Sequence, residues 1–108
     1  MKLYGIKACD TCRKAMKELS NSGREVEFID IRLNPPAMGV FESFYSSLGG
    51  DLVNQRSKTW REMTESEKKL SHVEMFQKFP TVMKRPVLVD GESMTLGWNE
   101  KVRAHWIG

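Results

Sequence analysis

The first thirty residues change their hydrophobic period twice, and this pattern constrains the fold more than any other feature of the chain. Residues 2–5 alternate and are partly apolar, which predicts a short strand. From Asp10 the apolar side chains recur with the spacing of one helix face, at Cys12, Ala15, Met16 and Leu19. Gly23 predicts the end of that helix, and residues 26–31 alternate again as a second strand. The chain therefore opens as strand, helix and strand, with its CxxC sequence at the strand-to-helix turn.

The middle of the chain has helical patterns. Residues 34–36 (Asn-Pro-Pro) break the chain and can open a helix that residues 49–50 (Gly-Gly) end. Within it, helical spacing is shared by Phe41, Phe44, Tyr45 and Leu48. Capping-box patterns at residues 64–67 and 71–74 predict two further short helices, the second running to residues 79–80.

Strand patterns return near the end. Residues 86–89 have the composition of a buried strand, residues 90–91 (Asp-Gly) form a turn, and residues 93–96 form a returning strand. Asn99 is placed to cap a last helix that bears Val102 and Trp106. Helices packed on one sheet make this an α/β fold.

The length of 108 residues predicts a single domain, 1–108, in which the helical segment at about 35–80 is an insertion. A domain of this size buries enough surface to fold without disulfides or a metal ion. Lys and Arg number 17 and Asp and Glu number 14, a net charge of +3, and no block of five like charges occurs. The basic runs at residues 56–61 and 83–86 are too short for a nucleic-acid groove, so we expect no direct nucleic-acid partner.

The sequence also predicts a cytoplasmic protein with no membrane partner. No window approaches the ~20 apolar residues of a membrane span, and the first ten residues lack the apolar run of a signal peptide. Two cysteines without a secretory segment are typical of a reducing compartment. A monomer is the default expectation.

The two cysteines, Cys9 and Cys12, admit four interpretations: a structural disulfide, half of a metal site, a redox pair, or chance. A bridge between them would close a very short loop and constrain the unfolded chain little. Structural zinc needs four ligands, and His72 and His105 are far apart, with no partner three to five residues away. We therefore expect no bound metal or other cofactor. A redox pair is favoured, with a small apolar core residue as the alternative for Cys12.

A helix that begins at Asp10 places Cys9 at its N-cap, where unpaired backbone N–H groups and the helix dipole favour an anion. Thiols at such positions have pKa values lowered from ~8.5 toward ~3.5–7.5. Lys7 and Arg13 add positive charge, and Asp10 opposes it. Cys12 lies one turn into the helix, where we expect it to be more buried and less activated. Cys9 is thus the expected nucleophile, and Cys12 the thiol that resolves the resulting mixed disulfide or sulfenic acid.

Two arginines are candidates for holding a substrate's negative charge. Arg85 precedes Pro86 at the start of the predicted third strand, where an X-Pro bond in the cis form would press the backbone against the CxxC loop. Arg56 lies in the sequence QRSKTW. The alternative for each arginine is a solvated surface residue. The residues alone favour that alternative for Arg56 and leave both interpretations open for Arg85.

Four segments carry a resemblance to a known family: YGIKACDTCRKA, QRSKTWREM, KRPVLVDG and LGWNE. Through them nearly the whole chain resembles the arsenate reductase (ArsC)/Spx family of thioredoxin-fold proteins, most closely its YffB-like branch. The resemblance implies a thioredoxin-like fold, with a mixed four-stranded sheet flanked by helices and a helical insertion between the second and third strands. It also implies that Cys9 is the nucleophile, that Arg56 and Arg85 bind the substrate anion, and that Pro86 is a cis-proline.

Thr11, Arg13 and the backbone N–H groups of residues 10–12 complete the expected anion site. Glutathione-coupled arsenate reductases of the family carry a third oxyanion-binding arginine in the segment that corresponds to residues 96–98, where this chain has none. Losing one charge-assisted partner, worth ~1.5–3 kcal/mol, costs roughly one to two decades of affinity or rate. We therefore expect a glutathione-dependent thiol reductase, with glutathione as co-substrate and weak or no arsenate reduction. A true arsenate reductase is an alternative.

A second class of function is implied by the Spx proteins, which are redox-sensing transcription regulators that bind the RNA polymerase alpha subunit. The chain shares their CxxC and RSK sequences, and its GWNE is similar to their GYNE. The sequence ends at residues 107–108 without the charged tail seen in Spx, which favours an enzyme. The regulator stays open as an alternative, with the RNA polymerase alpha subunit as its partner. The reductant that recycles the thiols also stays open between glutathione, glutaredoxin and thioredoxin.

Overall fold

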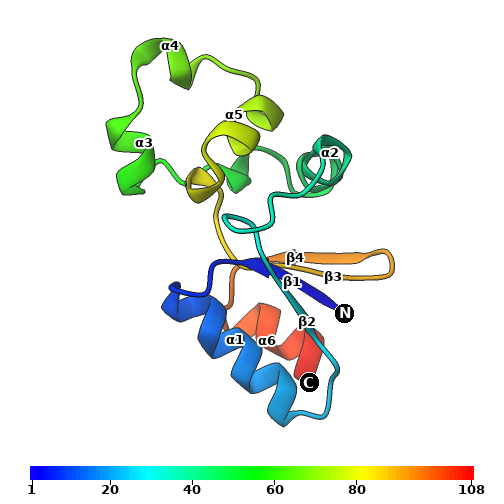
Figure 1. Ribbon diagram of the computed structural model, residues 1–108. Coiled ribbons are helices and arrows are strands. Elements are labelled where there is room, and N and C mark those ends of the chain that lie inside the picture. Colours follow the sequence, from blue (N-terminus) through cyan, green and yellow to red (C-terminus); the bar gives the residue numbers. More distant parts are fainter. The chain divides into compact units, whose positions relative to one another are not determined.

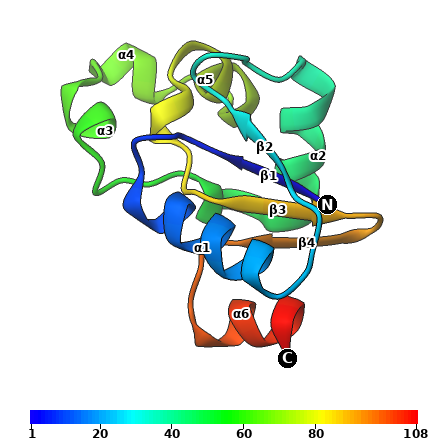
Figure 2. The same ribbon diagram turned by 60° about the horizontal axis from the view of Figure 1, so that its bottom comes forward.

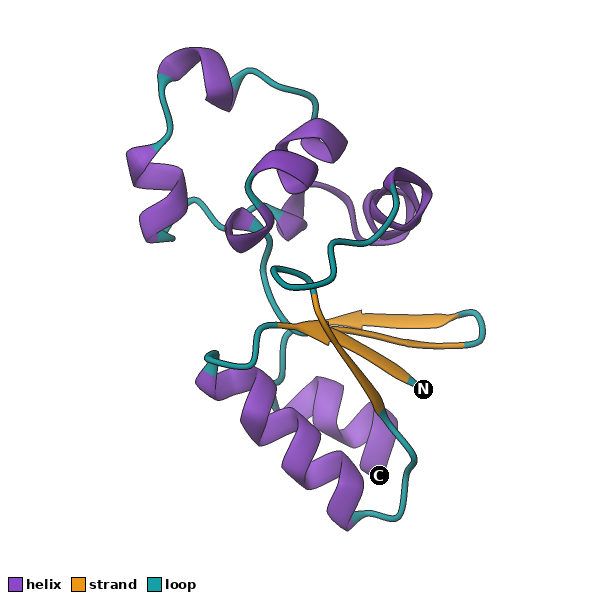
Figure 3. Cartoon of the chain, in the orientation of Figure 1, coloured by secondary structure: helices purple, strands orange, loops and turns teal.

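The computed structural model describes all residues from Met1 to Gly108, and its contacts divide them into two compact units. The first, here called the thiol unit, contains Met1–Ile31 and Arg85–Gly108. The second, the helical unit, contains Arg32–Lys84. Figures 1 and 3 show the helices and strands of each unit.

The thiol unit is built on a mixed four-stranded sheet with the strand order β2-β1-β3-β4. Its strands are β1 (Lys2–Gly5), β2 (Glu27–Asp30), β3 (Val87–Asp90) and β4 (Ser93–Leu96). β1 and β2 are parallel, with Leu3 opposite Phe28, whereas β3 is antiparallel to both β1 and β4. A parallel pair joined through a helix, followed by an antiparallel hairpin, is the thioredoxin-like arrangement that the family resemblance implies.

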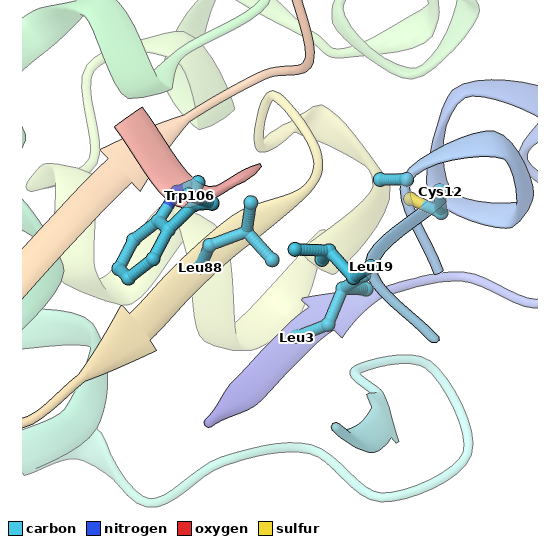
Figure 4. Packing of buried hydrophobic residues seen from close by; sticks show 6 residues of the cluster. Leu3, Cys12, Leu19, Leu88 and Trp106 are labelled. Atoms are coloured by element: carbon cyan, nitrogen blue, oxygen red, sulfur yellow. The ribbon is translucent and has the colours of Figure 1, made fainter. Parts of the chain in front are cut away.

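Helices α1 (Asp10–Asn21) and α6 (Glu100–Ile107) lie on the same face of this sheet (Figures 1 and 2). The core between helices and strands (Figure 4) consists of Leu3, Cys12, Ala15, Leu19, Leu88 and Trp106. Cys12, Ala15 and Leu19 belong to the predicted apolar face of α1, so the hydrophobic period identified the side that packs on the sheet. The Trp106 indole N–H donates to Thr95 Oγ1 at 2.8 Å and ties α6 to β4.

Helix α1 begins and ends where the sequence predicts. Cys9 is its N-cap residue, with an extended backbone at φ −82° and ψ 120°. At the other end, Gly23 adopts φ +93°, a left-handed conformation that glycine reaches without strain, and its N–H donates to Ser20 C=O at 3.1 Å. The cap of α6 is also as predicted, because Asn99 Oδ1 accepts a hydrogen bond from Val102 N–H at 2.9 Å.

The helical unit consists of α2 (Met38–Leu48), α3 (Lys58–Glu62), α4 (Glu65–Lys68) and α5 (His72–Lys78), with short 3-10 helices at Gly49–Leu52 and Pro80–Val82. Its core is aromatic. The ring centroid of Phe41 lies 6.2 Å from that of Phe44 and 5.9 Å from that of Phe76, and all three side chains are buried. In neither unit is a helix both long enough and apolar enough to cross a membrane.

Two features of the helical unit differ from the sequence expectation. Helix α5 ends at Lys78 rather than at residues 79–80, because Pro80 begins a 3-10 helix. Helix α3 has no counterpart among the predicted elements. It is too short to show an apolar period, and its signal is Ser57, whose side chain accepts a hydrogen bond from Trp60 N–H at 3.1 Å.

The two capping patterns do mark helix starts, but to different degrees. Thr64 Oγ1 accepts from Glu67 N–H at 3.1 Å while Glu67 Oε1 accepts from Thr64 N–H at 2.8 Å, so this capping box is complete. In the second pattern, Ser71 Oγ accepts from Glu74 N–H at 3.3 Å. Helices α4 and α5 therefore begin as predicted.

Candidate active site

Cys9 and Cys12 lie where β1 leads into α1. The connecting loop is closed by a hydrogen bond of 2.9 Å from Cys9 N–H to Ile6 C=O, and α1 starts where Arg13 N–H donates to Cys9 C=O at 3.0 Å. Cys9 is half-buried, whereas Cys12 is fully buried in the core (Figure 4), and both are free thiols. Of the two sulfurs, that of Cys9 is therefore the one a substrate can reach.

The surroundings of Cys9 stabilise its thiolate. Burial alone raises the pKa of this thiol. Hydrogen bonds from the Cys12 backbone N–H, the Cys12 thiol and the Arg85 guanidinium, together with the charge of Arg85, outweigh burial and lower the pKa of Cys9 below its ordinary value. The lowered pKa increases the fraction of Cys9 that is present as the reactive thiolate near neutral pH.

Cys12 has the opposite environment. Burial, reinforced by the neighbouring Cys9, outweighs a hydrogen bond to the Ile6 backbone and raises the pKa of Cys12 to about 12. Cys12 therefore stays protonated at neutral pH and hydrogen-bonds the Cys9 sulfur as a thiol. The two cysteines are chemically unequal, which is the difference that a nucleophile and a resolving thiol require.

Gly5, at the end of β1, allows Cys12 to pack closely on the sheet. A Cβ atom at residue 5 would lie 2.5 Å from Cys12 Sγ, 3.2 Å from Cys12 Cβ and 3.2 Å from Leu3 Cδ2. Carbon and sulfur atoms that are not bonded do not approach to 2.5 Å, so only a residue without a side chain fits beneath the thiol.

Asp30 supports the loop that precedes Cys9. Its side chain is buried at 3% exposure, and its Oδ2 accepts a hydrogen bond of 2.9 Å from Lys7 N–H. A bond of 2.9 Å from Ile31 N–H to Gly5 C=O joins the same two segments. A buried carboxylate is costly unless it is hydrogen-bonded, so Asp30 favours the loop conformation in which Lys7 N–H reaches it. Asp30 was not predicted from the sequence, where its only signal is an acidic residue at the end of an alternating strand.

Arg85 and Pro86 lead into β3 of the thiol unit. The Arg85–Pro86 peptide bond is cis, as expected from the sequence. Pro86 is buried, and its C=O accepts a hydrogen bond of 2.8 Å from Gly97 N–H. Arg85 is half-buried and its guanidinium hydrogen-bonds the Cys9 sulfur, so Arg85 is not the solvated surface residue that the sequence left as an alternative.

Thr11 and Arg13 are exposed on the first turn of α1. Arg13 forms an ion pair with Asp10 of the same turn, so a local carboxylate offsets its charge. The interactions that lower the pKa of Cys9 come from Cys12 and Arg85. Lys7 and Arg13, expected from the sequence to supply positive charge there, are not among these groups, whereas Arg85, which is distant in sequence, is.

Arg56 belongs to the helical unit. Its backbone N–H donates to Asn54 Oδ1 at 3.1 Å, and its C=O accepts from Arg61 Nη1 at 3.3 Å. The exposed side chain lines a cavity of about 690 Å³ that Asp51 and Lys84 also line. Asp51 belongs to none of the segments noted in the sequence, and Lys84 was noted only as part of the basic run at residues 83–86 and of the segment KRPVLVDG. The structure thus groups Cys9, Cys12, Arg85 and Pro86 in one unit and gives Arg56 different neighbours.

The segment LGWNE acts on the packing of α1 and α6. The Trp98 indole N–H donates to Glu18 Oε2 at 2.5 Å, and Arg103 Nε lies 3.5 Å from the same oxygen. Glu18 therefore connects the cysteine-bearing helix to the end of β4 and to α6. The residues are 80 positions apart in sequence, which is why no local pattern predicts the contact.

Each histidine packs on an aromatic ring. The His72 ring centroid lies 4.7 Å from that of Tyr45, and the His105 centroid lies 4.6 Å from that of Trp106. No group of three or more His, Cys, Asp or Glu side chains is arranged to hold a metal ion.

Comparison with known proteins gives consistent similarities. The ArsC family model matches residues 4–105. An uncharacterized protein of Haemophilus influenzae is 35% identical over 104 residues, which are 92% of this chain and 91% of that protein. The global transcriptional regulator Spx of Streptococcus agalactiae is 29% identical over 109 residues, which cover 94% of this chain and 80% of that protein.

Among solved structures, the YffB protein superposes with a TM-score of 0.90 at 28% sequence identity. The superposition covers 99% of this chain and 98% of the YffB chain. The similarity thus extends over the segments of both units.

Proposed function

This chain belongs to the ArsC family, and on that premise we propose that it is a thiol–disulfide oxidoreductase that uses glutathione as its co-substrate. One observation carries the proposal. Cys9 is a half-exposed N-cap residue whose pKa, although burial raises it, is lowered overall by a backbone N–H, a second thiol and an arginine. Such surroundings are typical of reactive cysteines, whereas structural cysteines are buried and inert.

In the first step, the Cys9 thiolate attacks the glutathione sulfur of a mixed disulfide, R–S–S–G. A Cys9–S–S–G bond forms and the original S–S bond breaks, so that R–S⁻ leaves and takes a proton from solvent to give R–SH. Arg85 and the Cys12 N–H hold the negative charge on Cys9 before the attack. Thr11 and Arg13, at the same helix end, are proposed to contact the anionic substrate.

In the second step, Cys12 resolves the intermediate. Cys12 loses its proton to solvent and attacks Cys9, so that a Cys9–Cys12 disulfide forms and the thiolate of glutathione leaves. Once Cys9 is bonded to glutathione, it no longer raises the pKa of Cys12. Burial, the larger cause of the raised pKa, still disfavours deprotonation of Cys12. A free glutathione thiolate can instead attack the glutathione sulfur of Cys9–S–S–G, so that oxidised glutathione forms, the bond to Cys9 breaks and the Cys9 thiolate leaves.

The cycle closes when two thiols reduce the Cys9–Cys12 disulfide. Glutathione is the proposed reductant, with glutaredoxin and thioredoxin as alternatives. The reducing cytoplasm is the proposed compartment, because it supplies these thiols and keeps both cysteines reduced. Arg56 is proposed to bind a carboxylate of the substrate. Since residues 96–98 contain no arginine, arsenate is proposed to be a poor substrate.

The test is NADPH consumption in an assay coupled to glutathione reductase, with a small mixed disulfide and arsenate supplied separately. We expect turnover of the disulfide, its loss in Cys9→Ser, and unchanged turnover in Ser47→Ala, an exposed serine of the helical unit. Arsenate turnover is expected to be slower than disulfide turnover. Disulfide turnover that survives in Cys9→Ser would refute the assignment of the nucleophile.

The similarity to Spx favours a second candidate, a redox-sensing regulator that binds the RNA polymerase alpha subunit. In that case oxidation to the Cys9–Cys12 disulfide would change the affinity for the partner. Binding of purified alpha subunit, measured with the oxidised protein and with Cys12→Ser, separates the two functions. Oxidation-dependent binding of the alpha subunit, without turnover of the mixed disulfide or of arsenate, would refute the enzyme function and support the regulator.

A further inference from the structure

The cavity of the helical unit carries a charge pattern that points to a ligand class. Arg56 and Lys84 contribute two cations to its lining, and Asp51 contributes one carboxylate. All three side chains are exposed, and none forms an ion pair within the protein. Three charged groups thus surround one cavity without neutralising one another, so they remain available to an incoming charged molecule.

Backbone contacts hold two walls of the cavity together. Val53 and Met83 form an antiparallel bridge. Beside it, Lys84 N–H donates to Leu52 C=O at 2.7 Å, and Asn54 N–H donates to Val82 C=O at 2.8 Å. The backbone of Lys84 is therefore fixed before any ligand binds. This preorganisation lowers the entropic cost of binding.

The turn after this bridge fixes Arg56 in the same way. Asn54 Oδ1 accepts a hydrogen bond of 3.1 Å from Arg56 N–H. The Asn54 C=O accepts from both the N–H of Ser57, at 3.1 Å, and its hydroxyl, at 2.7 Å. The backbone of Arg56, a residue that lines the cavity, is thereby held in place.

We infer that this cavity binds the amino-acid ends of glutathione, with Lys84 and Asp51 as binding residues beside Arg56. The inference rests on the proposed function and names the group that the cavity recognises. Glutathione carries two carboxylates and one ammonium, and the cavity offers the complementary set of two cations and one carboxylate. Its volume of about 690 Å³ lies within the usual range of small-molecule sites.

The same charge pattern discriminates against simple oxyanions. Phosphate or arsenate would be attracted by Arg56 and Lys84 but would meet the negative charge of Asp51. Glutathione turns that carboxylate from a repulsive group into a partner for its ammonium. Asp51 is therefore the residue that separates the two ligand classes.

The test is calorimetric titration of the full chain with S-methylglutathione, a thioether that cannot exchange disulfides. Lys84→Gln is expected to weaken binding about twofold to fivefold, because it removes one exposed cationic contact. The matched control is Lys78→Gln, an exposed lysine of the same unit that does not line the cavity, and it is expected to leave binding unchanged. Equal effects of the two substitutions would overturn the inference, as would the absence of binding by the unsubstituted protein.

Asp51→Asn supplies a readout that a loss of local structure cannot imitate. It is expected to weaken S-methylglutathione about threefold and to strengthen inorganic phosphate by a similar factor. N-acetyl-S-methylglutathione lacks the ammonium, so Asp51→Asn is not expected to weaken the binding of this ligand relative to the unsubstituted protein. Glu42→Gln, at an exposed position of α2, is the control. A change of the same sign for S-methylglutathione and phosphate would overturn the assignment of Asp51.

Turnover in the coupled assay is measured on the same samples, so that binding and chemistry can fail separately. Lys84→Gln is expected to raise KM for the glutathione mixed disulfide and to leave kcat nearly unchanged. Normal turnover with an unchanged KM in Lys84→Gln would overturn this inference and keep the proposed function. If the protein binds S-methylglutathione in the charge-dependent way described but shows no turnover, the inferred binding site is supported and the proposed enzymatic function is refuted.

Discussion

The thiol unit and the helical unit present their candidate functional groups in different ways. Cys9 and Cys12 owe their chemistry to burial, a helix N-cap and a cation at the sulfur. Arg56, Lys84 and Asp51 are instead exposed groups around a cavity, and their charges act on whatever enters it. Substitutions at the thiols and their supports should therefore change reactivity and folding stability together. Substitutions at the cavity should change ligand binding with little effect on stability.

The largest expected effect lies within the thiol unit, in the reactivity of its two thiols. The pKa of Cys12 is raised to about 12, whereas that of Cys9 lies below the ordinary value of 9.0. At pH 7 the thiolate fraction of Cys9 is therefore much larger than that of Cys12. The weaker nucleophilicity of a low-pKa thiolate offsets part of this, and burial of Cys12 adds to it. We expect iodoacetamide to alkylate Cys9 about a hundredfold faster than Cys12, or more.

Peptide mass spectrometry of the alkylated native protein measures both rates. Unfolding in urea is the control, since it should remove most of the difference. The pH profile carries the sign of the shift. Because the folded protein stabilises the Cys9 thiolate, its alkylation should reach half of its plateau at a lower pH than in urea. Equal native rates for the two thiols would contradict the division of labour between them.

The next effect concerns stability of the thiol unit. Gly5→Ala would place a Cβ atom 2.5 Å from Cys12 Sγ, within a packed core that cannot shift freely. We expect the free energy of unfolding to fall by about 1–3 kcal/mol. Gly39→Ala is the control in the helical unit, because a Cβ there meets nothing within 4 Å, and it should be neutral or slightly stabilising. Chemical denaturation followed by circular dichroism compares them, and equal losses would contradict the close packing beneath Cys12.

Local patterns were sufficient for much of the thiol unit. The alternation of residues 2–5, the helical period from Cys12 and the stop at Gly23 each depend on neighbours along the chain, so the sequence alone predicts β1 and α1. The N-cap position of Cys9 follows from the same boundary. The cis bond before Pro86 was expected from its place at the start of a strand and from the family resemblance.

Contacts between distant residues were not predictable in this way. Asp30 bonds Lys7 across 23 positions, and Glu18 meets Trp98 across 80. The pairing of Lys84 with the segment around Leu52 likewise depends on the folded helical unit. An acidic or basic residue in a single sequence is most often a solvated surface group, so the sequence did not predict these contacts of Asp30, Glu18 and Lys84.

A smaller effect is expected from the cation at the Cys9 sulfur. Arg85→Gln removes a hydrogen bond and a charge that favour the thiolate, so the pKa of Cys9 should rise and its alkylation at pH 7 should slow severalfold. The sign is decided by which form the cation stabilises, and here it stabilises the charged one. The rate at pH values above the ordinary pKa should change little. Arg13→Gln is the comparison, since Arg13 is paired with Asp10, and a larger effect of Arg13→Gln than of Arg85→Gln would refute the role of Arg85.

The smallest effect tests whether the two units can be perturbed separately. Thr64 and Glu67 form a complete, exposed capping box at the start of α4, so Thr64→Ala should lower the free energy of unfolding by about 1 kcal/mol. Ser66→Ala, at an exposed position of the same helix, should change it less. Because α4 contains none of the groups that set the pKa of Cys9, the alkylation rate of native Cys9 should be the same in both variants. A slower or faster Cys9 in Thr64→Ala would mean that the helical unit also controls the thiol, and that reactivity and binding cannot be assigned to separate parts of the chain.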